Sequence, residues 1–270
     1  MLPAPPPLSV FTKAERRLIR RLPTPEAVQR FLNRLPYNTE RQRETLRSFR
    51  QTVRHGRAHC AESAIFAATV LEQHGYPPLI LSIESIDYLD HVIFLYRRNG
   101  RWGTIARSRD PGLHGRKPVF RSVRALAASY IDEYVDATGC VQGFAYVDLR
   151  RFVAIDWRFS RKNLWALERV LTKTRHRRIK VPRKRLLDMR ARYLAYREKH
   201  GGRKPLFYRG RKNWTAIPKE FHRPTNETRR RRRRHRRVVG SRLRNMGHTA
   251  RTRDRGTPPK RRLKRRTGKL

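Results

Sequence analysis

The residues best suited to chemistry are Cys60 and His91. Cys60 follows Arg57-Ala58-His59 and precedes the small-residue run Ala61-Glu62-Ser63-Ala64, which is typical of the first turn of a helix. A thiol forms a thiolate at neutral pH where positive potential is close; a helix N-terminus supplies about half a unit charge and an imidazolium supplies more. If His91 lies against the start of this helix, the two side chains form a nucleophile and its proton acceptor. That is the chemistry of acyl transfer and amide hydrolysis.

The alternative interpretation is structural, with Cys60 a small buried apolar residue and His91 a residue at the end of a strand. A rival base, His59, is the immediate neighbour of Cys60. Adjacent residues on a helix point in different directions, so we do not expect their side chains to meet. His114 lies in a glycine-containing loop, and the sequence suggests no partner for it.

Two predicted elements must position this pair. Residues 60–74 are apolar nearly all round, which predicts a buried central helix rather than a surface helix. Residues 91–98 and 101–107 are predicted to be the arms of a hairpin joined by Asn99-Gly100, with residues 79–83 as a neighbouring strand. Both side-chain sets of the first arm are apolar, so both faces of the sheet should be covered.

The two-residue turn also predicts the register of the hairpin, because it fixes which residues lie opposite each other. The expected pairs are Arg98 with Arg101, Phe94 with Ile105, and His91 with Ser108.

These residues resemble the transglutaminase-like superfamily, and more narrowly a bacterial branch of it. The resemblance covers about residues 20–218. It rests on these segments: Arg57-Ala58-His59-Cys60-Ala61-Glu62-Ser63-Ala64, Asp90-His91-Val92-Ile93, Gly100-Arg101-Trp102-Gly103 and Ala106-Arg107-Ser108-Arg109-Asp110. It implies a papain-related α/β scaffold that carries a Cys/His/Asp site, with Cys60 and His91 as the first two members.

The third member departs from that family pattern, since Ala106 stands where the acidic residue is expected. In the predicted register Ala106 and Asp110 are the diagonal same-face neighbours of His91, with Ser108 directly opposite. Asp110 is therefore the candidate that would orient the imidazole. A turn-initiating role before Pro-Gly is the alternative for Asp110. Asp90 points to the other face and is the weaker candidate.

The remaining pattern predicts an α+β fold in one domain, residues 12–218, with its central helix packed on an antiparallel sheet. A Pro-rich leader, residues 1–11, and an Arg-rich tail, residues 219–270, are expected to be disordered. Further helices are expected at 12–22, 24–36, 40–54, 122–135, 163–171 and 183–199. One further hairpin is expected at 206–217.

Charge is distributed unevenly along the chain. The formal net charge is +46, and 54 arginines outnumber 13 lysines. Residues 1–170 carry 28 basic and 16 acidic side chains, whereas residues 171–270 carry 39 and 5. A surplus of this kind predicts attraction to nucleic acid or another polyanion through residues 171–270. Aromatic residues among the basic ones at 203–223 could add stacking on bases.

Several classes of function and site are disfavoured. Two cysteines, Cys60 and Cys140, without repeated spacing, supply neither a disulfide framework nor a CxxC zinc site, and we expect no metal or cofactor. No apolar run reaches the ~20 residues that span a bilayer, and the N-terminus lacks a signal-peptide pattern, so we expect a cytoplasmic protein.

The sequence therefore predicts a Cys60-dependent acyl-transfer or amide-hydrolysing enzyme that acts on a peptide or amide substrate. The alternative is an inactive transglutaminase-like scaffold that binds a polyanion through its basic C-terminal third.

Overall fold

The fold is α+β, built on an antiparallel sheet. The computed structural model describes residues 2–88 and 90–222. Over these residues six strands form one sheet in the order β4-β3-β2-β1-β5-β6. The strands are β1 (Leu79–Ser85), β2 (His91–Arg98), β3 (Arg101–Ile105), β4 (Arg116–Phe120), β5 (Val141–Asp148) and β6 (Arg177–Arg178).

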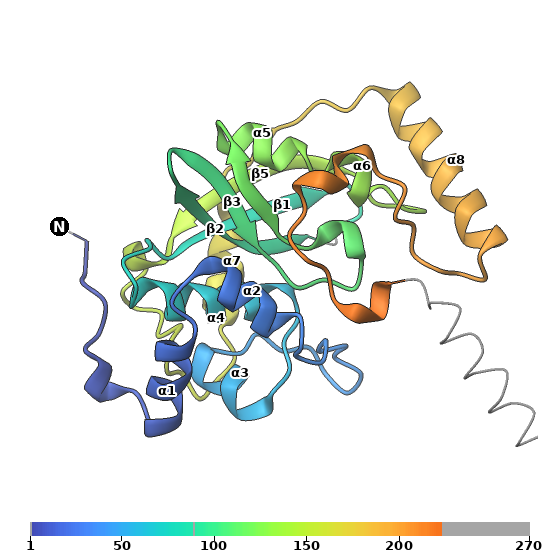
Figure 1. The fold of residues 1–270 in the computed structure, drawn as a ribbon. Helices are drawn as coiled ribbons and strands as arrows, with labels where there is room; N and C mark the ends of the chain where they lie inside the picture. The colour runs from blue at the N-terminus through green and yellow to red at the C-terminus, as the bar shows by residue number, and fades with distance from the viewer. Residues whose placement is uncertain (1, 89, 223–270) are drawn as a thin grey trace, which may run out of the picture. The chain divides into compact units, whose positions relative to one another are not determined.

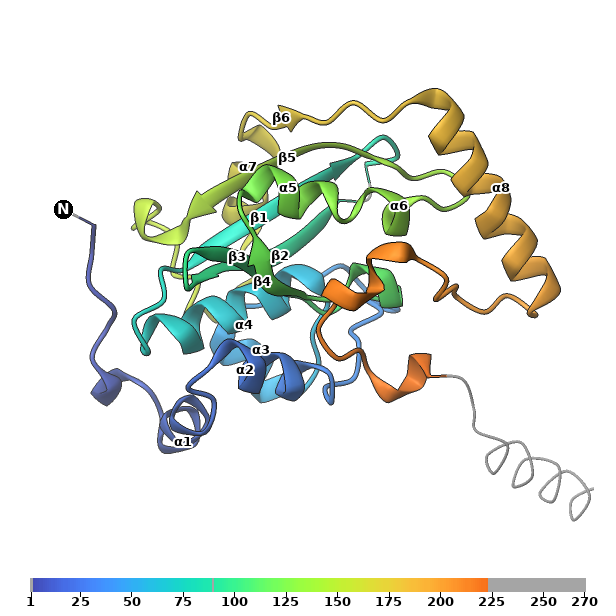
Figure 2. The same ribbon diagram turned by 45° about the horizontal axis from the view of Figure 1, so that its top comes forward.

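Eight α-helices surround the sheet in the described part of the chain. They are α1 (Lys13–Arg21), α2 (Pro25–Leu32), α3 (Phe49–His55), α4 (Cys60–Glu72), α5 (Val123–Ala128), α6 (Ile131–Tyr134), α7 (Trp165–Lys173) and α8 (Arg183–Lys199). In Figures 1 and 2 the sheet lies between a layer with α2, α3 and α4 and a thinner layer with α5 and α6. The prediction that both faces of the sheet are covered is confirmed.

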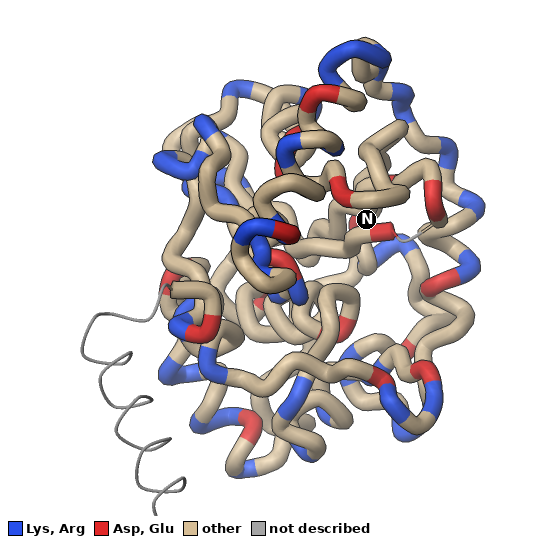
Figure 3. Tube along the Cα trace, turned by 90° about the vertical axis from the view of Figure 1, so that its right-hand side faces the viewer, with Lys and Arg blue, Asp and Glu red and all other residues tan. Residues whose placement is uncertain are grey.

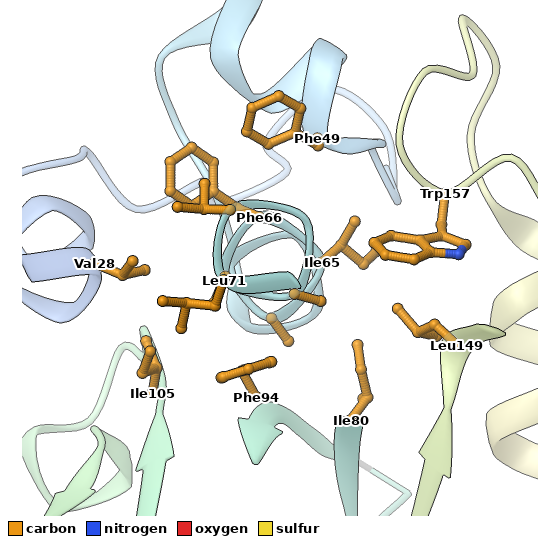
Figure 4. Close-up of a cluster of buried hydrophobic side chains, with 14 of the residues drawn as sticks. Val28, Phe49, Ile65, Phe66, Leu71, Ile80, Phe94, Ile105, Leu149 and Trp157 are labelled. Atoms are coloured by element: carbon orange, nitrogen blue, oxygen red, sulfur yellow. The ribbon is translucent and has the colours of Figure 1, made fainter. Parts of the chain in front are cut away.

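Helix α4 is the centre of the larger layer. Every residue of it from Ala61 to Glu72 is buried. Figure 4 looks along this helix and shows apolar side chains on all sides of it, which come from α2, α3, the strands and the loop that carries Trp157. A helix that is apolar all round needs such surroundings. The central position predicted for residues 60–74 is confirmed, and the helix ends at Glu72.

The opposite face of the sheet has its own core. Odd-numbered strand residues such as Ile93 and Leu95 pack in one cluster with Leu126 of α5, Tyr130 just before α6, and Tyr134 of α6. By the alternation of a strand, His91 belongs to this face. A third cluster joins α8 to the segment that carries Tyr208 and Trp214.

Local signals explain where the N-terminal helices begin. Thr12 caps α1 in a capping box with Glu15, and Thr24 caps α2 with Pro25 in the first turn. Helix α3 ends at Gly56, whose φ of 60° places it in the left-handed region that favours glycine.

The predicted hairpin is also present. Asn99 and Gly100 adopt positive φ angles of 49° and 72°, and the pairs Phe94–Ile105 and Arg98–Arg101 form as expected. The third predicted pair does not form, because β3 ends at Ile105 and Ser108 is not opposite His91. The side chain of Gln29 instead binds both backbone groups of Ala106: its Nε2 donates to the carbonyl at 2.8 Å, and its Oε1 accepts from the N–H at 3.0 Å.

Two predicted elements differ from the structure. The helix expected at 40–54 is limited to α3, because residues 38–48 bind the buried Glu62 carboxylate and Ser48 then caps the helix. The hairpin expected at 206–217 is absent from the described residues. Residues Arg209–Asn213 form a 3₁₀-helix, and Trp214 bridges to Arg116 of β4.

The ends of the predicted domain also differ from the structure. The leader expected over 1–11 contains a 3₁₀-helix, Leu8–Val10, and the ring of Phe11 is buried in the core against Phe49 and Phe159. At the other end, Lys219–Phe221 form a further 3₁₀-helix. The rest of the predicted tail, residues 223–270, lies outside the described residues.

Residues 2–88 and 90–221 belong to one compact unit. Over the described residues, no helix is both long enough and apolar enough to cross a membrane. Figure 3 shows Lys and Arg spread over the face that includes α8, with Asp and Glu between them.

Candidate active site

Cys60 and His91 meet at one end of the sheet. Cys60 is the first residue of α4, and His91 is the first residue of β2. Both side chains line the same cleft, His91 lowers the pKa of the Cys60 thiol, and His91 is 3% exposed. Its ring lies edge-on to Tyr130 and Tyr134, with centroids 6.3 and 6.4 Å away. The structure therefore brings together the two residues that the sequence predicted as a pair.

The hydrogen bond of Nε2 identifies the tautomer of the His91 ring. Nε2 lies 2.7 Å from the carbonyl oxygen of Leu113. Because a carbonyl oxygen can only accept, Nε2 carries a proton and donates it. In the neutral ring Nδ1 is then unprotonated and available to the thiol, which is the arrangement that a general base for Cys60 requires.

The loop that carries the Leu113 carbonyl is held by a buried arginine. Arg116 is completely buried and donates to the carbonyls on either side, those of Gly112 at 2.8 Å and His114 at 2.9 Å. Its guanidinium also stacks on Tyr130, 3.9 Å from the ring centroid. Burial with these acceptors fixes the loop, so the carbonyl that orients His91 belongs to a rigid segment.

His114 fastens the same loop from within. Its Nδ1 donates to the carbonyl of Asp110 at 3.0 Å, and its Nε2 accepts the Ser108 N–H at 3.5 Å. Burial and the Arg107 guanidinium lower the pKa of His114 to about 3, so the ring is neutral. This histidine, for which the sequence suggested no partner, acts as a structural bridge.

Asp110 does not orient His91, which corrects the prediction. Its carboxylate pairs with Lys204, with 2.6 Å between Oδ1 and Nζ, and its N–H donates to Ser108 Oγ. The reason is the early end of β3: without strand pairing beyond Ile105, the predicted diagonal contact does not form. Asp110 still lines the cleft beside the pair.

His59 is a second imidazole at the thiol, contrary to expectation. It is the N-cap of α4 with extended backbone, φ −90° and ψ −171°, so the rule for adjacent helical residues does not apply. Its Nε2 donates to the Thr45 carbonyl at 2.7 Å, its Nδ1 lies 3.3 Å from the backbone nitrogen of Ala61, and the ring lowers the pKa of the Cys60 thiol. The N-cap signal was available in the sequence, since Glu62 follows three residues later as in a capping box.

These neighbours set the ionisation of the thiol. Burial favours the neutral form, but hydrogen bonds from His59 and His91 and their charges outweigh it and lower the pKa of Cys60 well below its ordinary value. In return, although burial opposes it, the hydrogen bond and charge of Cys60 and the charges of Glu62 and Glu40 raise the pKa of His59 to about 9. Cys60 is therefore poised as a thiolate near neutral pH.

The buried carboxylate of Glu62 binds the residues around His59 and so stabilises its position. Its Oε1 accepts from Thr45 Oγ1 at 2.8 Å and from the Arg47 N–H at 3.2 Å. Its Oε2 accepts from Asn38 Nδ2 and from the His59 N–H, each at 3.1 Å. Sequence patterns do not reveal this role of Glu62, because two of its donors, Thr45 and Arg47, lie in segment 40–54, which the pattern predicts to be helical.

The pair opens into a cleft of about 400 Å³, lined by residues that include Tyr37, Tyr134 and Asp110. That volume falls in the range of small-molecule and peptide-side-chain sites. The backbone N–H of Cys60 lies in the first turn of α4, where N–H groups have no intrahelical acceptor. It is thus available to a developing oxyanion.

The second cysteine, Cys140, is not among the residues that line this cleft. Cys140 is free and buried, and burial raises its pKa. Within residues 2–88 and 90–222, no three His, Cys, Asp or Glu side chains gather as a metal site.

Comparison with known proteins completes the description of the site. No protein-family model matches the chain, and no curated protein matches it.

Proposed function

We propose that the protein is a transglutaminase-like thiol enzyme that acts on the acyl group of an amide, with Cys60 as nucleophile and His91 as general acid and base. One observation carries the proposal: a helix-start thiol shares a cleft with an imidazole whose Nε2 is anchored to the Leu113 carbonyl, and this imidazole lowers the pKa of the thiol. The α+β scaffold, with a buried helix against an antiparallel sheet, supports it.

The geometry supports a two-step reaction. The Cys60 thiolate attacks the amide carbon, and the negative charge that develops on the carbonyl oxygen is stabilised by the Cys60 N–H and the N-terminal end of α4. Protonated His91 then gives the proton on Nδ1 to the departing amine, which leaves a thioester on Cys60. Water or a second amine, deprotonated by Nδ1, attacks the thioester and restores the thiol.

The neutral Leu113 carbonyl takes the place of a carboxylate in this scheme. It holds the ring orientation and the Nε2–H tautomer, which are the positioning tasks of the third member of a triad. It carries no full charge, so it stabilises the imidazolium less than a carboxylate does. Protonated His59, the second cation at the thiol, offsets this weaker stabilisation of the ion pair because its charge stabilises the thiolate.

Iodoacetamide alkylation of Cys60 tests the proposal. In a Cys140→Ser background, we expect Cys60 to react at pH 6–7 at least about tenfold faster than a free cysteine, because its thiolate fraction is higher. His91→Ala should slow the reaction in this pH range. Equal rates for Cys60 and free cysteine, unchanged by His91→Ala, would exclude thiol catalysis.

A second function, polyanion binding, is favoured by α8. Basic residues such as Arg183, Lys184, Arg192 and Lys199 are exposed on this helix. Binding of single-stranded RNA should weaken steeply as salt rises, and Lys184→Gln with Lys199→Gln should reduce the slope of the log–log salt plot. An unchanged slope would place the binding elsewhere.

A further inference from the structure

The cleft that contains Cys60 and His91 is acidic, although the chain is strongly basic. Among the described residues that line it, eight are Asp or Glu and one is an arginine, Arg109. The whole chain has 21 acidic and 67 Lys or Arg side chains. More than a third of the acidic residues therefore line one cleft together with a single arginine.

Two of these acids belong to the framework of the site. Asp110 is paired with Lys204, and the buried Glu133 lies 3.8 Å from Arg116 and accepts from the Trp214 indole. The positive charge of these partners offsets their own charge. Among the other six, Glu40 lies 3.7 Å from Nε2 of His59.

Those six fall into two groups on different elements. One group lies in the β1–β2 turn and the loop after α6, where Thr138 Oγ1 donates to Asp87 Oδ2 at 2.9 Å and so ties the two loops together. The other group lies before α3 and on α7. The first group is Asp87, Asp90 and Asp136, and the second is Glu40, Glu44 and Glu168. Carboxylates thus reach the cleft from four separate segments of the chain.

Aromatic side chains accompany the carboxylates. Tyr88 lies between Asp87 and Asp90 in sequence, has a positive φ of 61°, and is 89% exposed at the cleft. Tyr37 and Trp165 also line the cleft. Carboxylates attract cations, and the faces of exposed aromatic rings add a further favourable interaction with a guanidinium or ammonium group.

We propose that the substrate of this site is a Lys- or Arg-rich polypeptide segment. The inference rests on the proposed thiol function and specifies its substrate class. An amide carbonyl of the segment reaches Cys60, while cationic side chains contact the two acidic groups. A polypeptide fits better than a free polyamine, because only the former supplies the acyl carbon that a thiolate attacks.

The electrostatic part is tested with two thiol reagents that differ in charge, a trimethylammonium and a sulfonate methanethiosulfonate. At low salt in the Cys140→Ser background, Cys60 should prefer the cationic reagent at least about tenfold, relative to free cysteine. The preference should shrink as salt screens it and in Glu44→Gln with Glu168→Gln, but persist in the exposed control Glu198→Gln.

A matched cysteine controls for the net charge of the whole chain. Val153 is 78% exposed and follows Arg150 and Arg151. In a Cys60→Ser/Cys140→Ser background, Val153→Cys should prefer the anionic reagent. If Cys60 shows the same anionic preference, the acidic cleft does not govern access to it and the proposal is wrong.

Peptide protection tests the substrate class itself. A capped Arg/Gln peptide should slow iodoacetamide alkylation of Cys60 at concentrations at least about tenfold lower than the matched Glu/Gln peptide. Fast alkylation of Cys60 with equal protection by both peptides would overturn the substrate class and leave the thiol function standing. A Cys60 that reacts like a free cysteine would instead overturn the thiol function.

Discussion

Replacing the buried Glu62 by Gln is the sharpest test of how the site is supported. The carboxylate is completely buried and accepts four hydrogen bonds, two on each oxygen. Gln has the same shape, but one of its two positions becomes an NH₂ group. Whichever way the amide lies, two donors lose their acceptor and face another donor.

The less costly orientation places the NH₂ where Oε1 was. Thr45 can then rotate its hydroxyl to accept from the amide, but the backbone N–H of Arg47 remains without an acceptor. A buried unsatisfied N–H costs about 1–3 kcal/mol, and the loss of charge on the bonds that remain adds about 1 kcal/mol. We therefore expect Glu62→Gln to lower the free energy of unfolding by about 2–4 kcal/mol.

Urea denaturation measures this loss. With an m-value of about 2 kcal/mol per M, the midpoint should fall by about 1–2 M at unchanged m. Glu198→Gln, at an exposed position on α8, is the matched control and should not move the midpoint. The reasoning is refuted if Glu62→Gln unfolds at the same urea concentration as the wild type.

Two further predictions concern the imidazoles and Asp110. Because the pKa of His59 is raised from 6.5 to about 9, its protonation stabilises the fold fully below pH 6.5, and this stabilisation is lost as the pH rises to about 9. The difference in unfolding free energy between wild type and His59→Gln should therefore shrink across that interval, and a difference independent of pH would contradict the charged ring. The Leu113 carbonyl, and not Asp110, orients His91, so Asp110→Asn should change the rate of Cys60 alkylation at neutral pH less than about threefold. A loss of rate comparable to that of His91→Ala would show that Asp110 does act on His91.

Local signals were sufficient to predict the core of the site. The apolar surface of residues 60–72 and the Asn99-Gly100 turn each depend on short-range rules, namely helical periodicity and a turn that needs positive φ. Together they predicted that a helix carrying Cys60 and a strand carrying His91 belong to one core.

The third member could not be predicted because it depends on a contact distant in sequence. Gln29 of α2 occupies both backbone groups of Ala106, ends the strand there, and turns the chain into the loop that Arg116 and His114 hold. The group that then reaches His91 is a backbone carbonyl, and every residue has one. Side-chain identity at Leu113 therefore carried no information about its role.

The uncharged partner of His91 and the second imidazole at His59 have a common consequence for the proposed chemistry. A carboxylate at the third position stabilises the imidazolium of His91, and without it the ion pair depends on cations placed elsewhere. Here the raised pKa of His59 places a positive charge directly at the thiol. Glu62 and Glu40 favour that charge, so the carboxylates that support the ion pair act through His59 and not through His91. His59→Gln should therefore slow Cys60 alkylation at pH 6 while leaving the tautomer of His91 intact, whereas in a site that relies on one histidine the same change would have little effect.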